Sequence, residues 1–140
     1  MPEPRPSPFS YAILRVVPRV ERGERFNAGV VLFSRQRGFL GAKVHLDERR
    51  LAALAPDAPA DEVRVHLDAL VGVAEGDPDC GPIAEMPQSE RFGWLVAPSS
   101  TIIQPSRVHT GLTADPAATL QALFAELVEP VGVRGKGATR

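Results

Sequence analysis

The sequence predicts an α+β fold: a two-layer sandwich in which helices pack on one face of a mostly antiparallel sheet of about five strands. Short β-branched and aromatic runs lie near the N-terminus, amphipathic segments with helical spacing follow them, and a capped apolar segment lies near the C-terminus. The 140 residues, of which 44% are hydrophobic and 24% charged, suffice for one compact core.

Three strands are predicted in the N-terminal third. Residues 11–17 are β-branched and aromatic, and Pro18, which cannot donate to a strand ladder, ends the run. Residues 29–35 form a nearly continuous apolar run, which indicates a central strand covered on both faces. Residues 39–46 follow a glycine-containing link of hairpin length, so we expect them to pair antiparallel to the preceding strand.

Two helices are predicted next. Asp47 can cap a short helix that reaches Leu54, and a longer helix begins at Ala60, where apolar residues recur at three- and four-residue spacing. Residues 88–95 fit either a short helix or an extended segment, and the helix is favoured. These helices are expected to cover one face of the sheet.

Two short β-like runs, residues 101–104 and 107–110, are predicted to form edge strands or one bent strand. In the final helix Asp115 is the cap and Pro116 the first residue, and Pro130 stops it.

The chain is expected to contain one domain, residues 9–131. Four prolines in the first eight residues predict a flexible arm over 1–8, and three glycines predict a flexible tail over 132–140. The N-terminus has no apolar core of a secretory signal, and no apolar run approaches 18 residues. We therefore expect a cytoplasmic protein without a membrane partner.

Composition and motifs argue against several classes of function. A net charge of -1 at pH 7 gives no broad basic field, which makes nucleic-acid binding unlikely as a function. Neither of the common glycine-rich phosphate loops is present, and the three histidines lie far apart, so no cofactor and no metal are expected. The single cysteine, Cys80, lies in a turn with two acids, Asp77 and Asp79, whose carboxylates disfavour its thiolate.

The first candidate binding segment spans residues 15–29, which are rich in arginine. Planar guanidinium groups match phosphate and carboxylate bidentately, so this segment is a candidate anion site. Its candidate residues are Arg15, Arg19, Arg22 and Asn27. The alternative is an exposed loop with solvated charges, in which Asn27 only shapes the entry to the second strand.

The second candidate segment spans residues 94–111 and concentrates polar side chains around the only tryptophan. Its candidate residues are Trp94, Ser99, Ser100, Gln104, Ser106 and His109. A serine nucleophile with His109 as base is one interpretation, but no nucleophile-elbow motif accompanies it. Turn capping and cross-strand pairing by these hydroxyls is the preferred alternative.

Strand alternation connects the two segments. Arg15, Lys43, His45, Arg107 and His109 can each lie on the non-helical face of their strand. If the strands are neighbours, this face is a polar groove for an anionic ligand or an acidic partner, and the alternative is an ordinary solvated face. Tyr11 and Ile13 share the parity of Arg15, which favours a ligand groove or a protein interface.

The sequence also resembles a bacterial family catalogued as a domain of unknown function, number 3037, over roughly residues 9–130. The motifs that carry the resemblance are residues 11–18, 21–24, 27–33, 91–95, 98–100, 104–106 and 109–111. The family offers no catalytic residues to transfer. The resemblance implies a protein partner, a kinase-fold protein of the persistence-toxin type encoded by a neighbouring gene.

Two functions therefore stand as predictions. The first is a small protein-interaction or regulatory module, because no catalytic constellation is assembled beside the two polar segments. The alternative is an enzyme or ligand-binding domain for an anionic small molecule, with Arg15 and Arg22 as anion clamps and His109 as an acid or base.

Overall fold

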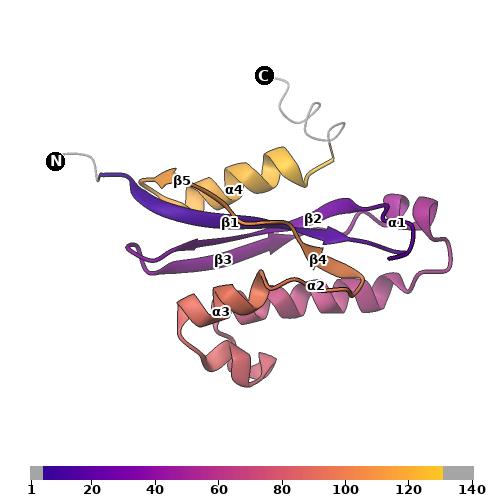
Figure 1. Ribbon diagram of the computed structural model, residues 1–140, viewed down its shortest axis with the longest axis horizontal. Coiled ribbons are helices and arrows are strands. Elements are labelled where there is room, and N and C mark those ends of the chain that lie inside the picture. Colours follow the sequence, from indigo (N-terminus) through magenta and orange to yellow (C-terminus); the bar gives the residue numbers. More distant parts are fainter. Residues whose placement is uncertain (1–4, 131–140) are drawn as a thin grey trace.

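A computed structural model of the chain describes residues 5–130, which form one antiparallel sheet with helices on both of its sides (Figure 1). The strands are β1 (Ser7–Val16), β2 (Phe26–Ser34), β3 (Phe39–Val44), β4 (Ile103–Pro105) and β5 (His109–Thr113). The helices are α1 (Glu48–Leu54), α2 (Ala60–Glu75), α3 (Gln88–Leu95) and α4 (Pro116–Leu127), with the 3₁₀ turns η1 (Pro78–Cys80) and η2 (Pro82–Glu85). The α+β class and the five-stranded antiparallel sheet are confirmed.

Local chemistry explains where the helices begin. The Asp47 carboxylate accepts the backbone N–H groups of Arg49 and Arg50 at the start of α1, and the Asp115 carboxylate accepts that of Ala118 at the start of α4. Both predicted caps are confirmed. The segment that was ambiguous in the sequence, Gln88–Leu95, is a helix whose buried side chains are Phe92 and Leu95.

The strands follow the order β3-β2-β1-β4, and β5 pairs with β1 on the same edge as β4. β4 and β5 are thus two short strands laid end to end along β1. β1 begins at Ser7, so Ser7 and Pro8, which were expected in the flexible arm, belong to the sheet. The Pro8 carbonyl accepts the Ser34 hydroxyl at 3.1 Å, and the Ser7 hydroxyl accepts the Arg37 Nε–H at 3.0 Å.

The helices occupy both sides of the sheet, so the prediction that they pack on one face is wrong (Figure 1). On one side, hereafter the α2 side, α1, α2 and α3 cover a large core that includes Leu14, Val31 and Leu67. On the other, the α4 side, α4 packs on β2 and β3 over a smaller core that includes Leu32 and Phe124. The second helical layer exists because β2 is apolar on both faces.

A β-bulge in β2 changes which side chains share a face. Leu14 pairs with Gly29 but Arg15 pairs with Asn27, so Ala28 has no partner on β1. After this extra residue, odd-numbered and even-numbered side chains of β2 exchange the faces of the sheet to which they point. Asn27 therefore points to the α4 side with Val30, although one is odd-numbered and the other even-numbered.

The free edge of β4 is locally blocked. The Ile102 carbonyl accepts the N–H of Val17, just after β1, and the Ser106 N–H donates to the Ile13 carbonyl of β1. By alternation, Ile103 and Pro105 direct their backbone groups outward. Pro105 has no N–H, and the Ile103 carbonyl accepts the Thr101 hydroxyl at 2.9 Å.

Within residues 5–130, no helix is long and apolar enough to cross a membrane. The expected tail over 132–140 and the first four residues of the expected arm lie outside the described residues.

Candidate functional site

β1 brings the two candidate segments together. Arg15 pairs with Asn27 of β2 on one side and with Gln104 of β4 on the other. Directly paired residues of antiparallel strands point to the same face, so these three side chains form one row across three strands on the α4 side. We call this set the Arg15 row.

The guanidinium of Arg15 lies half-buried beside that of Arg25. Burial, followed by repulsion from the Arg25 cation, lowers the pKa of Arg15 from its ordinary value, although the group stays charged at neutral pH. Among residues 5–130, neither Arg15 nor Arg25 takes part in an ion pair. Two neighbouring cations without an acidic counterpart are a candidate site for an anion.

The amides that flank Arg15 have their donors engaged. The Asn27 side-chain N–H donates to the Leu127 carbonyl at the end of α4 at 3.0 Å. The Gln104 side-chain N–H donates to the Thr101 carbonyl at 2.9 Å. Both bonds fix the amides in place on either side of the Arg15 cation.

His109 joins the same side of the sheet farther along β1. It pairs with Tyr11, and the two rings stack with centroids 5.1 Å apart. Tyr11 and Arg15 share a face of β1, as predicted from their parity. We call Tyr11 and His109, together with Arg25 and the Arg15 row, the β1 surface.

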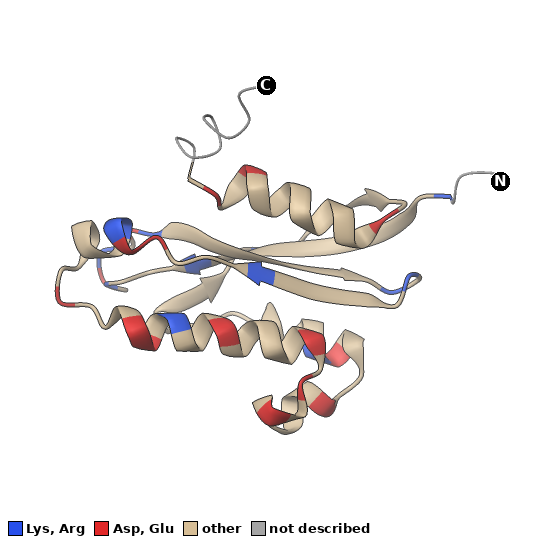
Figure 2. Cartoon of the chain, turned by 180° about the vertical axis from the view of Figure 1, so that it is seen from behind, with Lys and Arg blue, Asp and Glu red and all other residues tan. Residues whose placement is uncertain are grey.

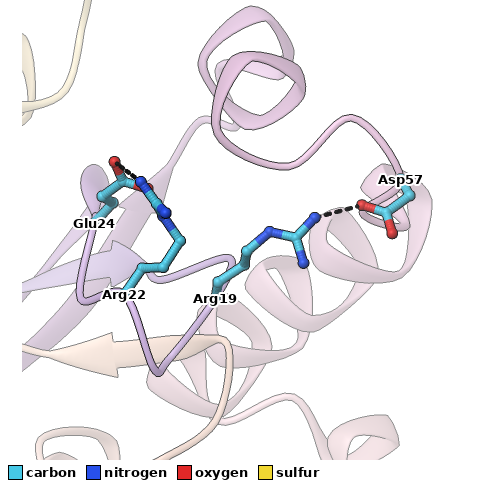
Figure 3. Close-up of polar contacts among 4 residues, drawn as sticks. All are labelled: Arg19, Arg22, Glu24 and Asp57. Atoms are coloured by element: carbon cyan, nitrogen blue, oxygen red, sulfur yellow. Dashed lines mark hydrogen bonds and ion pairs between the residues drawn. The ribbon is translucent and has the colours of Figure 1, made fainter.

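Two predicted residues of the first segment lie elsewhere. Arg19 pairs with Asp57 at 3.1 Å and Arg22 with Glu24 at 2.7 Å, both in exposed loops (Figure 3). The hydrogen bond from Arg22 lowers the pKa of Glu24. Since both guanidinium groups already hold carboxylates, the prediction that Arg22 acts as an anion clamp has no support in the structure.

Trp94 and Ser99 lie on the α2 side of the sheet, away from the β1 surface. Both line a cavity with Leu14, and Leu14 points to the side opposite its neighbour Arg15. Ser100 is exposed and follows Ser99 in the loop after α3. The second candidate segment is therefore divided between the two sides of the sheet.

Ser106 has a structural role. It is buried, and its hydroxyl accepts the Ile13 N–H at 2.9 Å and donates to the Arg107 carbonyl at 2.8 Å. The hydrogen bond from Ile13 ties β1 to the residues between β4 and β5. Among the hydrogen bonds of residues 5–130, none joins a serine hydroxyl to His109, so the serine nucleophile has no support.

The predicted groove with Lys43 and His45 is not formed, because β2 separates β3 from β1. Lys43 lies instead under α4, with its ammonium 5.3 Å from the centroid of the Phe124 ring. The Lys43 ammonium also donates a hydrogen bond to the side-chain carbonyl of Gln121 on α4.

Arg25 was not singled out in the sequence. Its position beside Arg15 follows from the antiparallel pairing of β1 and β2 together with the bulge at Ala28. The strand pairing was predictable only in part, because the predicted second strand began at Gly29 and omitted residues 26–28.

Charge is unevenly divided between the two sides (Figure 2). Acidic residues gather along α2 and in the segment that follows it, whereas α4 carries few charges. The acids on this segment are Asp61, Glu62, Asp68, Glu75, Asp77, Asp79 and Glu85. The cations of the β1 surface therefore face away from the acidic side of the protein.

Cys80 lies in η1 among these acids. Burial, and then the carboxylates of Asp77, Asp79 and Glu75, raise the pKa of its thiol. The expectation that neighbouring acids disfavour the thiolate is confirmed. Within residues 5–130, no group of three or more His, Cys, Asp and Glu side chains has the arrangement of a metal site.

Alkylation of Cys80 is expected to require a higher pH than alkylation of an ordinary thiol. Iodoacetamide labelling of the folded protein, followed by mass spectrometry across pH 7–10, should show half-maximal reactivity at a higher pH than in denaturant. The thiol's contribution to stability is present below its unfolded pKa and is lost as the pH rises through the folded value.

Asp79→Asn should move the folded labelling curve toward lower pH, because it removes one carboxylate and keeps the Asp77 cap of η1. Identical curves for folded and denatured protein would contradict the assignment.

A family model described as Protein of unknown function (DUF3037) matches residues 11–128. No curated protein and no solved structure matches the chain.

Proposed function

Given that the chain belongs to the family Protein of unknown function (DUF3037), we propose that it is a protein-interaction module whose β1 surface binds an acidic segment of a partner protein. The observation that carries this proposal is the half-buried cation of Arg15 beside Arg25, without an acidic counterpart among residues 5–130.

The shape of the β1 surface supports a macromolecular partner. Small-molecule sites are concave and bury most of their ligand. Among residues 5–130, four of the more pronounced cavities have volumes of about 280–440 Å³, and none of these four is lined by Arg15, Arg25, Asn27 or His109. A sheet surface with cations and half-buried aromatic rings matches the composition of protein interfaces, in which arginine and tyrosine are enriched.

The charges support an acidic partner segment. Arg15 and Arg25 repel each other, and a carboxylate placed between them relieves that repulsion and forms charge-assisted hydrogen bonds. The acids of the α2 side repel the same segment, which orients the partner toward the α4 side. The stacked pair of Tyr11 and His109 offers an apolar contact next to the cations.

The proposal is tested with a fluorescently labelled hexaglutamate peptide, titrated by anisotropy at low ionic strength. Arg25→Glu is expected to weaken binding about tenfold, because it replaces attraction by repulsion. Arg49→Glu is the matched control: it makes the same charge change at an exposed arginine of α1 and should leave the affinity within about twofold. Added salt should weaken binding to the wild-type protein.

Equal effects of Arg25→Glu and Arg49→Glu would refute the proposed surface. Citrate or phosphate that competes with the peptide at lower concentrations than glutamate does would replace the proposal by binding of an anionic small molecule. The kinase-fold protein that the family resemblance implies is the first purified partner to test with the same two variants.

A further inference from the structure

A recessed site lies on the α2 side of the sheet, behind the β1 surface. It is a cavity of about 300 Å³ between α2, α3 and β4, lined among others by His66, Leu70, Trp94 and Ile103. An apolar cavity of about 150 Å³ accommodates a benzene ring, so this one has room for a substituted ring.

The walls of the cavity select against charge. No Asp, Glu, Lys or Arg lines it, and His66 is the one ionisable side chain in its lining, so an ion placed there would exchange its hydration for a mostly apolar wall. Trp94 is 46% exposed although it is the largest side chain of α3, and the neighbouring Phe92 and Leu95 are buried in the core. A large aromatic side chain at the mouth of an apolar cavity provides a stacking surface for a ring.

The hydroxyl groups at the rim of the cavity have assigned donors and acceptors. The Thr101 hydroxyl donates its hydrogen to the Ile103 carbonyl at 2.9 Å, so in its 2.9 Å contact with the Ser99 hydroxyl the donor is Ser99. The hydrogens of both hydroxyls are thereby used. The Ser99 hydroxyl also accepts the Thr101 backbone N–H, so each hydroxyl keeps one lone pair, which can only accept a hydrogen bond from a ligand.

We propose that this cavity binds a small neutral molecule composed of an aromatic ring and a single hydroxyl or N–H donor. The ring packs between Trp94 and the apolar floor formed by Leu70 and Ile103, and the donor bonds to the Ser99–Thr101 hydroxyl pair. The site is independent of the proposed partner surface, because it lies on the other side of the sheet.

The test uses three probes of nearly equal size in ¹H–¹⁵N NMR titrations of the full chain. 4-Methylphenol carries a donor, 4-methylanisole has the oxygen without the hydrogen, and 4-methylbenzoate is charged. We expect 4-methylphenol to shift the Trp94 indole N–H and the amides of Ser99 and Thr101 in a saturable manner. The anisole should bind at least fivefold more weakly, and the benzoate should cause no saturable shift.

Ala97→Phe should abolish the 4-methylphenol shifts, because it places a ring at the exposed rim of the cavity. Ala117→Phe makes the same change at an exposed position of α4 and should leave the affinity unchanged. Equal binding of phenol and anisole, saturable binding of the benzoate, or persistence of the shifts in Ala97→Phe would overturn the proposal. Hexaglutamate binding should be the same in wild type and Ala97→Phe, so the two proposals fail separately.

Discussion

Replacement of Phe124 by alanine is expected to lower the free energy of unfolding by about 3–5 kcal/mol. Phe124 is 8% exposed and belongs to the smaller core under α4, where it packs with Leu32 and Leu120. The truncation removes the buried ring and leaves a cavity under α4, and both effects lower the stability. Domains of this kind have a total free energy of unfolding of about 5–15 kcal/mol. The variant should therefore unfold at a much lower midpoint concentration of urea than the wild type.

Leu112→Ala is the control for this experiment. Leu112 is an apolar side chain of β5 that is 68% exposed, and its truncation should change the free energy of unfolding by less than about 0.5 kcal/mol. If Phe124→Ala were no more destabilising than Leu112→Ala, α4 would not form a packed second layer.

Ser106→Ala is expected to cost about 1–3 kcal/mol, although it removes a single oxygen atom. The substitution leaves the buried N–H of Ile13 without its acceptor at the junction of β4 and β5. The loss should also appear locally: the Ile13 amide should exchange its hydrogen faster in the variant than in the wild type, as measured by NMR.

Ser100→Ala provides the comparison, since Ser100 is exposed and makes no hydrogen bond through its hydroxyl within residues 5–130. Its effect on stability should be under about 0.5 kcal/mol. Equal effects of the two substitutions would show that the Ser106 hydroxyl does not join the strands.

The second strand shows how far the sequence predicts the fold. Its nearly continuous apolar run correctly indicated a strand covered on both faces, which conflicted with the expectation of helices on one face only. The structure agrees with the run: Val31 packs under α2 and Leu32 under α4. The apolar stripe of α4 shows that the helix is amphipathic but does not show which side of the sheet it covers.

The candidate site was predictable where strand alternation alone determines which face of the sheet a side chain occupies. Tyr11 and Arg15 share a face because an uninterrupted strand carries both. Asn27 joins them only through the bulge at Ala28, which leaves no clear mark in the sequence. Trp94 was grouped with Gln104 and His109 by proximity along the chain, but α3 and β4 place them on different sides of the sheet.

The blocked edge of β4 limits how other molecules can attach to this protein. Pro105 lacks an N–H and the Thr101 hydroxyl occupies the Ile103 carbonyl, so an added strand cannot build a regular backbone ladder there. β-Augmentation, in which a partner strand binds mainly through backbone hydrogen bonds, is therefore disfavoured at this edge. Recognition near β4 depends on side chains, and the same feature protects this part of the sheet edge from edge-to-edge aggregation.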